Sequence, residues 1–142
     1  MFARKRMIRF ADVDPAGIVF YPRYFEMINE IVEDWFAEGL DCNWVELTLE
    51  RRKGAPLAHI EVDFTAPSRL YDELDFSLSV ARLGNSSIHL RIRADHAGEA
   101  RLAARLVIVY IDLDTRRSEP LPADLRRGAE RFLVSNAAGA AT

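Results

Sequence analysis

Residues 22–38, PRYFEMINEIVEDWFAE, decide how the rest of the chain must be arranged. Apolar side chains recur there at the spacing of one helix face, at Tyr24, Phe25, Ile28, Ile31, Val32, Trp35 and Phe36. The polar side chains fall on the opposite face, at Glu26, Asn29, Glu30, Glu33 and Asp34. This period of 3.6 residues predicts an amphipathic helix that begins at Pro22 and ends before Gly39. Such a helix must bury its apolar stripe against another element.

Downstream of this helix the apolar period changes from 3.6 to 2, which is typical of strands with one buried and one solvated face. Three segments alternate in this way, residues 59–65, 74–81 and 88–93. Residues 102–111 are apolar on both sides, which predicts a central strand covered on both faces. Hairpin turns are expected between these strands, at Gly84-Asn85 and at His96-Ala97-Gly98.

The remaining segments complete an α+β domain. Residues 5–10 predict a first strand with Ile8 and Phe10 on one side, residues 44–52 a short helix, and residues 121–133 a last short helix. Because one long helix must be covered and the sheet has one apolar face, we expect an antiparallel five-stranded sheet wrapped around that helix. Residues 1–135 then form a single domain, and residues 136–142 a loose C-terminal tail.

Composition narrows the class of protein. The chain has 142 residues, 49% hydrophobic and 29% charged, which fits one globular domain. A formal net charge of -3 argues against a nucleic-acid binder. The single cysteine, Cys42, excludes an internal disulfide and a multi-cysteine zinc site. Because no apolar run is long enough for a signal peptide or a membrane span, we expect a cytoplasmic protein without a membrane partner.

Residues 12–24, DVDPAGIVFYPRY, place two aspartates in a turn directly before the helix. Pro15 keeps Asp14 out of the helical conformation, and Gly17 allows backbone conformations that other residues avoid. The first N–H groups of a helix are unpaired and carry a partial positive charge. A carboxylate beside such donors can act as a base or a nucleophile next to an oxyanion site. Two alternatives are open: Asp14 could simply cap the helix, or the two aspartates could bind a cation.

The segment FADVDPAGIVFYPRYF, residues 10–25, resembles the signature of the 4-hydroxybenzoyl-CoA thioesterase family. That pattern consists of two aspartates around one residue, a short turn with Gly, an apolar pair, aromatics, and a Tyr that enters the helix. Residues 64–74, FTAPSRLYDEL, resemble the family's aromatic-x-x-Pro stretch and its acidic turn. Residues 120–122 resemble the segment that follows its last strand. The resemblance therefore covers nearly the whole domain, from about residue 5 to about residue 125.

The resemblance implies a hotdog fold and an acyl-CoA thioester substrate, with no metal or other cofactor besides the coenzyme A of the substrate. The family's catalytic carboxylate maps to Asp14, and the backbone N–H that polarises the thioester carbonyl maps to Tyr21, with Gly17 in the turn between them. Asp14 could attack the carbonyl or activate water as a general base. Asp12 is expected to support the turn. Hotdog domains pair edge to edge, so a homodimer or homotetramer with the site at the subunit interface is expected.

Further residues are expected to contact the substrate, a small aromatic or short-chain acyl-CoA. The substrate-binding candidates are Ile18, Tyr24, Gly54, Ala55, Pro56 and His59. Coenzyme A carries phosphates, so arginines should meet them, and the candidates are Arg82 and Arg91, with Arg93 and Arg69 as further possibilities. Some family members have basic residues in the turn that is occupied here by residues 84–87, which carry no positive charge. Coenzyme recognition must then use other residues or be looser.

Three other functions compete with hydrolysis. A hotdog hydratase or dehydratase usually needs a His near the helix, and no His lies between Pro15 and Leu40. A non-catalytic module that binds acyl-CoA or an acyl-carrier protein is disfavoured by the intact Asp14 and Gly17. A purely structural domain is disfavoured by the length of the motif. Thioester hydrolysis is therefore the function that the sequence favours.

Overall fold

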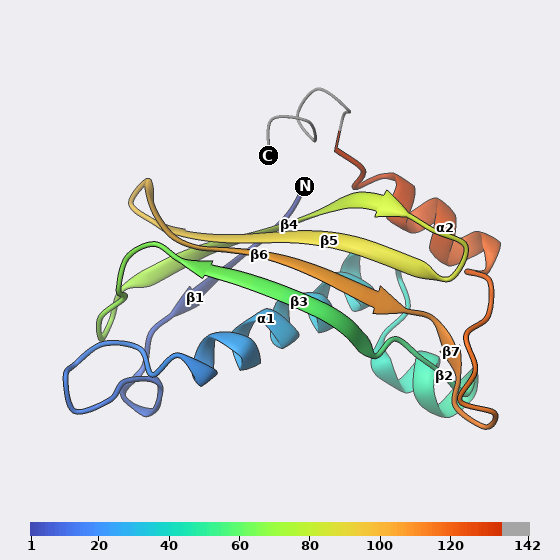
Figure 1. Ribbon diagram of the computed structural model, residues 1–142, viewed down its shortest axis with the longest axis horizontal. Coiled ribbons are helices and arrows are strands. Elements are labelled where there is room, and N and C mark those ends of the chain that lie inside the picture. Colours follow the sequence, from blue (N-terminus) through green and yellow to red (C-terminus); the bar gives the residue numbers. More distant parts are fainter. Residues whose placement is uncertain (135–142) are drawn as a thin grey trace.

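The computed structural model describes residues 1–134, so the tail expected at residues 136–142 lies outside them. Five strands form one antiparallel sheet in the order β1-β4-β5-β6-β3 (Figure 1). Their bounds are β1 Phe2–Met7, β3 Leu57–Phe64, β4 Glu73–Leu83, β5 Ser87–His96 and β6 Glu99–Val109. The sheet curves over one long helix, as a hotdog fold requires. The predicted α+β class and five-stranded antiparallel sheet are confirmed.

Helix α1 (Pro22–Asp34) crosses the inner face of the sheet (Figure 1). It continues as a wider π-helical segment, η2 (Trp35–Gly39), so the regular α-helix ends earlier than the sequence predicted. The other short elements are η1 (Phe10–Asp12), η3 (Val45–Glu50), β2 (Lys53–Gly54), β7 (Ile111–Asp112) and α2 (Ala123–Glu130). Among residues 1–134, no helix is long and apolar enough to cross a membrane.

The hydrophobic core lies between α1 and the inner face of the sheet. The helix contributes the buried side chains Tyr24, Met27, Ile28, Ile31 and Val32. The three central strands contribute alternate residues, including Leu78, Leu90, Ile92, Leu102 and Leu106. Burial of this apolar stripe contributes about 25 cal/mol for each Å² removed from water, and it fixes the direction of the helix across the sheet. The N-terminal end of α1 is therefore held in one place relative to the strands.

Two predictions about the strands were wrong. The first strand is β1, Phe2–Met7, rather than residues 5–10. Ile8 is buried, but Phe10 is 81% exposed because the turn η1 carries the chain out of the sheet. Strand β6 is central but not covered on both faces, since Ala103 and Arg105 are exposed while their neighbours in sequence are buried. The outer face of the sheet is thus open, and the apolar residues there are small or only half-buried.

Strand β3 forms one edge of the sheet and pairs only with β6 among the described residues. Its first and last residues, Leu57 and Phe64, are both about half exposed. A strand in this position presents a row of unpaired N–H and C=O groups along its free side. This edge runs beside α1 (Figure 1), so whatever covers it also lies near the helix.

Candidate active site

A tight hairpin leads the chain into α1. The Asp14 N–H donates to the Ile18 carbonyl at 2.9 Å, and the Phe20 N–H donates to the Asp12 carbonyl at 2.9 Å. Gly17 lies at the tip with φ of +80°, a conformation that residues with a Cβ rarely adopt. The predicted turn is confirmed, and its shape depends on Gly17.

Asp14 projects from this hairpin with half of its carboxylate unused. Its Oδ1 accepts the Ala16 N–H at 2.8 Å, and Oδ2 has no hydrogen-bond partner among residues 1–134. The residue is partly exposed. The helix N-cap is Tyr21, not Asp14. The alternative that Asp14 serves as the helix cap is therefore wrong, and its side chain is open to another use.

Tyr21 holds a free backbone donor at the N-terminus of α1. The next residue, Pro22, has no N–H, and the Arg23 N–H donates to the Phe20 carbonyl at 2.8 Å. Within the described chain the Tyr21 N–H has no hydrogen-bond partner. It lies at the end of the helix that carries the partial positive charge of the aligned peptide dipoles. Such a donor suits an oxygen that develops negative charge.

Asp12 fastens the hairpin to the body of the protein. Its carboxylate is buried, and Oδ2 accepts Arg6 Nη1 at 2.7 Å and the Arg9 N–H at 2.8 Å. Burial alone would raise the pKa of this carboxyl, but the hydrogen bonds from Arg6 and the Arg9 N–H outweigh burial and lower the pKa. Arg6 also lies 3.6 Å from Glu30 on α1. The expected supporting role of Asp12 fits this network.

An apolar cavity of about 210 Å³ lies alongside α1, next to the edge strand β3. Its walls include Phe25, Asn29, Trp44, Ala55, Pro56 and Leu57. Ala55 and Pro56, which the resemblance assigns to the acyl pocket, line this cavity, and their contact with an acyl group stays a prediction. Gly54 immediately precedes them in β2, where an added Cβ would come within 3.0 Å of the Leu113 side chain. The close approach of the Leu113 side chain to the Gly54 backbone explains why a residue without a Cβ occurs here.

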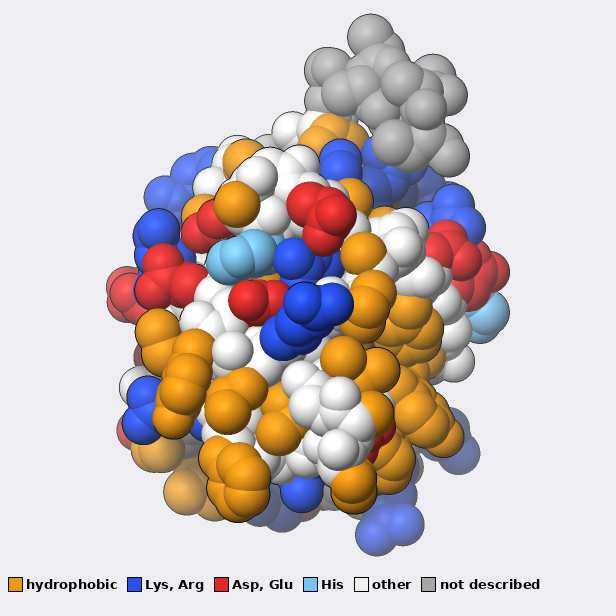
Figure 2. Space-filling model, turned by 90° about the vertical axis from the view of Figure 1, so that its left-hand side faces the viewer, with side chains coloured by type: hydrophobic (Ala, Val, Ile, Leu, Met, Phe, Trp, Pro, Cys, Tyr) orange, Lys and Arg blue, Asp and Glu red, His pale blue; other side chains and the backbone are white. Residues whose placement is uncertain are grey.

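The end of the molecule that carries the hairpin is rich in exposed aromatic side chains. Phe20, Tyr21 and Phe64 are each about half exposed or more. Phe64 contacts Tyr24 and Phe25 of α1, with ring centroids 5.5 and 6.5 Å apart. Figure 2 looks onto this end and shows hydrophobic side chains gathered around a few charged ones. The carboxylate and the free amide therefore lie at the same end as this aromatic surface, and Phe25 connects the surface to the lining of the apolar cavity.

The sequence matches the thioesterase-like superfamily over residues 8–128. The chain belongs to this superfamily. A 1,4-dihydroxy-2-naphthoyl-CoA hydrolase from Picosynechococcus is 32% identical over 128 residues, covering 85% of this chain and 86% of the relative. One from Synechococcus elongatus is 27% identical, covering 86% of this chain and 90% of the relative. The resemblance noted in the sequence is confirmed, and the protein is a thioester hydrolase.

Solved structures agree with this membership. A thioesterase superfamily protein from Jannaschia is 25% identical, with a TM-score of 0.88 over 94% of both chains. A 1,4-dihydroxy-2-naphthoyl-CoA thioesterase from Synechocystis is 24% identical, with a TM-score of 0.81 over 90% of this chain and 94% of that one. At this level of identity the second likeness supports the fold alone. The hotdog architecture of this superfamily member is thus confirmed.

Several of the site residues predicted from the sequence lie away from the cavity beside α1. His59 is exposed, with Nε2 3.2 Å from Glu61 Oε1, because it alternates with the half-buried Ile60 along β3. Arg82 lies near the end of β4, with Nη2 2.9 Å from His89 Nε2. Arg91 lines a different cavity, on the outer face of the sheet. Their predicted contacts with the acyl group or the phosphates stay predictions.

Two other candidates belong to the scaffold of the site. Ile18 accepts the Asp14 N–H and forms a β-bridge with Arg69, so it joins the hairpin to the segment that follows β3. Tyr24 is buried against Phe64, and its hydroxyl has no partner among the described residues. Asn29 and Trp44, which sequence reasoning did not select, line the cavity. Asn29 is exposed, as its assignment to the solvated helix face predicts, and its spacing of four from Phe25 was a usable signal that it also lines the cavity.

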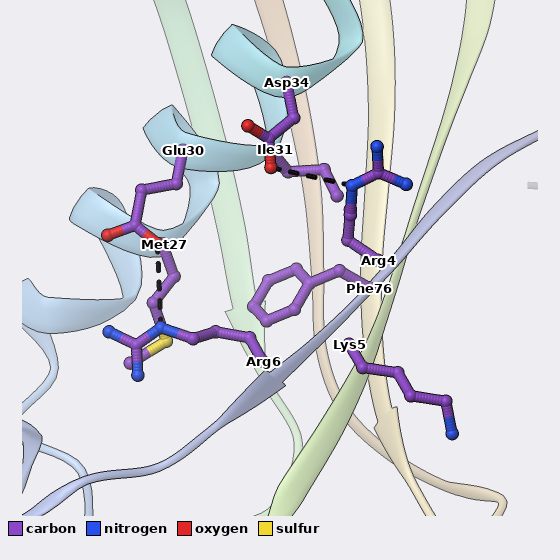
Figure 3. A pocket seen from close by; sticks show the side chains of 8 residues that line it. All are labelled: Arg4, Lys5, Arg6, Met27, Glu30, Ile31, Asp34 and Phe76. Atoms are coloured by element: carbon purple, nitrogen blue, oxygen red, sulfur yellow. Dashed lines mark ion pairs between the residues drawn. The ribbon is translucent and has the colours of Figure 1, made fainter. Parts of the chain in front are cut away.

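A second, smaller cavity lies on the opposite side of α1, beside β1 (Figure 3). Its volume is about 80 Å³. Two ion pairs cross it, from Arg4 Nε to Asp34 Oδ2 at 3.7 Å and from Arg6 Nε to Glu30 Oε2 at 3.6 Å (Figure 3). These charges are already paired with each other, so the ion pairs in this second cavity hold β1 against α1. The apolar cavity on the β3 side is the better candidate for an acyl group.

Proposed function

We propose that this protein hydrolyses aromatic acyl-CoA thioesters, with Asp14 as the catalytic carboxylate and the Tyr21 N–H as the oxyanion donor. The observation that carries the proposal is the pair of unused groups on the hairpin and the helix start, Oδ2 of Asp14 and the Tyr21 amide. Neither group makes a hydrogen bond within residues 1–134. Their residue types match the roles that the family resemblance assigns to these positions.

The proposed reaction begins with the thioester carbonyl accepting a hydrogen bond from the Tyr21 N–H. A preorganised donor of this kind contributes about 2.7–4 kcal/mol to stabilisation of the transition state. Asp14 then either attacks the carbonyl carbon, giving a mixed anhydride that water hydrolyses, or removes a proton from the attacking water. The C–S bond breaks in both routes, and the products are a carboxylic acid and free coenzyme A. The proposed steps use only protein groups and water.

The acyl group is proposed to be aromatic and to occupy the cavity beside α1. Curated relatives that align over most of this chain are named 1,4-dihydroxy-2-naphthoyl-CoA hydrolases. The cavity has aromatic walls from Phe25 and Trp44 and a volume of about 210 Å³. For comparison, an apolar cavity of about 150 Å³ is large enough to bind benzene. A ring with small substituents therefore fits the space.

A second copy of the chain is proposed to pair along β3. The exposed edge of β3 supports this, since an unpaired edge is a template for another strand. Leu57 and Ile60 belong both to this edge strand and to the wall of the cavity. A partner strand there would narrow the opening of the cavity and exclude water from it. The active site would then lie at the interface of a homodimer, or of dimers within a homotetramer.

Release of free thiol from a panel of thioesters tests the proposed function. The panel contains benzoyl-CoA, 1,4-dihydroxy-2-naphthoyl-CoA, acetyl-CoA and decanoyl-CoA. We expect kcat/KM for the best aromatic substrate to exceed that for both aliphatic ones by at least about tenfold. The reason is that an aliphatic chain does not fill the space between the aromatic walls of the cavity as a ring does. Faster turnover of the aliphatic substrates than of every aromatic substrate would contradict the proposed acyl class. Tight binding of all four without thiol release would instead indicate a non-catalytic binding module.

A further inference from the structure

The segment that connects β3 to β4, residues 65–72, has no part in the proposed reaction, and we call it the crossover. Strands β5 and β6 lie between β3 and β4 in the sheet, so the crossover must pass the turn that joins β5 to β6. The hairpin that leads into α1 lies at the same end of the molecule (Figure 1). The crossover is therefore placed between the end of the sheet and the candidate active site.

The crossover carries one arm of the active-site hairpin. The Val19 N–H donates to the Ser68 carbonyl at 2.9 Å, and Ile18 forms a β-bridge with Arg69. The Ile18 carbonyl in turn accepts the Asp14 N–H at 2.9 Å. A continuous path of backbone contacts thus joins the crossover to Asp14. The position of the Asp14 carboxylate depends on where the crossover lies.

Arg101, near the start of β6, holds the crossover from the side of the sheet. It is 8% exposed and is the one buried basic residue among residues 1–134. Its Nη1 lies within hydrogen-bond distance of three acceptors of the crossover, the Pro67 carbonyl at 2.9 Å, Ser68 Oγ at 3.2 Å and Asp72 Oδ2 at 2.9 Å. The Thr65 N–H also donates to the Arg101 carbonyl at 2.9 Å. Both ends of the crossover are therefore attached to this one residue.

The contact between Arg101 and Asp72 is a buried ion pair. Burial alone would raise the pKa of the Asp72 carboxyl, but the hydrogen bonds from the Arg69 N–H and from Arg101 outweigh burial and lower the pKa. Compared with apolar side chains of the same size, a buried ion pair contributes little net stability. The planar guanidinium instead bonds its acceptors in fixed directions. This pair is thus suited to fixing the position of the crossover.

We propose that Arg101 is a positioning residue for thioester hydrolysis, because it fixes the crossover and, through Ser68 and Ile18, the hairpin that carries Asp14. Without the guanidinium the crossover shifts, and the hairpin shifts with it. A displacement of about 1 Å at a reacting group can lower the rate about 10²-fold. No crossover residue lines the cavity beside α1, so binding of the acyl group is retained. This inference rests on the proposed catalytic role of Asp14.

The kinetic test compares three arginine variants. In Arg101→Met, which removes the guanidinium, kcat for the best aromatic acyl-CoA falls at least about tenfold, while Kd for its non-hydrolysable thioether analogue stays within about threefold. Arg101→Lys keeps a charge for Asp72 and restores kcat to within about threefold of the native value. The matched control is Arg126→Met, since Arg126 Nη2 donates to the Gly84 carbonyl at 2.7 Å in the turn at the other end of β4. Its kcat stays near native.

Hydrogen exchange at the Val19 N–H follows the contact between hairpin and crossover without any measurement of activity. Relative to the amides of β5, this exchange becomes at least about tenfold faster in Arg101→Met and is unchanged in Arg126→Met. Ser68→Ala removes one acceptor of Arg101 and gives a smaller change in the same direction, together with a smaller loss of kcat. The test therefore stands even if Arg101→Met does not fold.

Direct contact with coenzyme A is the competing account, since Arg101 borders a hollow that Arg69 and His96 also line. That account predicts thioether binding at least about tenfold weaker in Arg101→Met with kcat unchanged, and this result overturns the positioning role. Native kcat in Arg101→Met despite faster exchange at Val19 also overturns it, while hydrolysis stands. If the native protein releases no thiol, the proposed hydrolysis fails, and exchange at Val19 still decides whether Arg101 holds the hairpin.

Discussion

The two groups proposed to act on the thioester are not fully used in hydrogen bonds because of the conformation of the backbone around them. Asp14 has one carboxylate oxygen held by the Ala16 N–H and one unused, and the Tyr21 amide is unpaired because the first N–H groups of a helix have no intrahelical acceptor. Both depend on the hairpin keeping its shape, and that shape requires the positive φ of Gly17. Gly17, for which we propose no part in the reaction itself, therefore positions the two groups proposed to take part in it.

Substitution of Gly17 by alanine is expected to strain the hairpin. The left-handed conformation costs residues with a Cβ about 1–2 kcal/mol, and open space around Gly17 means that the strain comes from the backbone alone. Gly98→Ala, at the β5–β6 turn, is a matched control because Gly98 has φ of +82° and equally open surroundings.

Urea unfolding and thiol release distinguish the two glycine variants. Both should lose similar stability, while kcat should fall in Gly17→Ala and stay near the native value in Gly98→Ala. Equal kcat in the two variants would show that the hairpin conformation has no bearing on catalysis.

The sequence predicted residues near the hairpin better than residues along the cavity. Asp14, Gly17 and Tyr21 lie in a contiguous motif, and a motif preserves local geometry. It did not separate catalysis from capping, because the residue that becomes the N-cap, Tyr21, depends on the backbone conformation of the hairpin. Asn29 is exposed, as its place on the polar face of the helix predicts, but its contribution to the cavity lining was not predicted. Only the position of β3 and of residues 44–57 beside α1 creates a cavity there.

Among the elements, η1 is held to β1 and α1 by the buried Asp12 and its partner Arg6. Asparagine keeps one acceptor oxygen but has no charge, so the Arg6 guanidinium loses its ionic partner. We expect Asp12→Asn to lower the free energy of unfolding by about 1–3 kcal/mol near pH 7. Asp63→Asn, which removes an exposed carboxylate, is the control and should change it by less than about 0.5 kcal/mol.

The effect of Asp12→Asn should depend on pH in a defined direction. The pKa of Asp12 is lowered in the folded protein, so its contribution to stability is complete above the unfolded pKa of about 3.9. That contribution disappears as the pH falls through the lower, folded pKa. Unfolding free energies measured between pH 7 and pH 2.5 should therefore converge for the native protein and Asp12→Asn at the acid end. A difference that grows on acidification would contradict the ion pair.

The sequence predicted helix or strand correctly where the apolar period extended over many residues. The stripe of α1 and the alternation in β4 and β5 each extend over enough residues to define a period. The two-residue strands β2 and β7 have no period and were not predicted. Phe10 was placed in a strand because it alternates with Ile8, but the chain leaves the sheet after Met7 to form η1. Local alternation does not reveal where pairing stops.

For the whole molecule, the proposed assembly completes the site with a partner strand along the exposed edge of β3. Phe64 lies at the end of this edge and is 47% exposed, although it contacts the aromatic residues of α1. We expect sedimentation at micromolar concentration to show a dimer or a larger even assembly for the native protein. Phe64→Lys places a charge at the proposed interface and should shift the protein toward monomer, with loss of thiol release.

Leu49→Lys is the matched control for the assembly, because Leu49 is exposed on η3, away from β3. Its sedimentation and activity should remain native. A native protein that sediments as a fully active monomer would remove the interface from the site, and so would a Phe64→Lys variant with unchanged assembly. The single-chain sequence implied such pairing only through family resemblance, since an edge strand and a central strand share the same alternation.

The central claim is that Asp14 is the catalytic carboxylate, and thiol release by Asp14→Asn tests it most directly. The measurement uses the best aromatic acyl-CoA of the panel, with native protein and with Glu50→Gln, on η3, as a control for removal of an exposed carboxylate. A catalytic Asp14 predicts that turnover falls by about 10² or more in a folded Asp14→Asn protein and stays near native in Glu50→Gln. Equal turnover in the native protein and Asp14→Asn would contradict the mechanism.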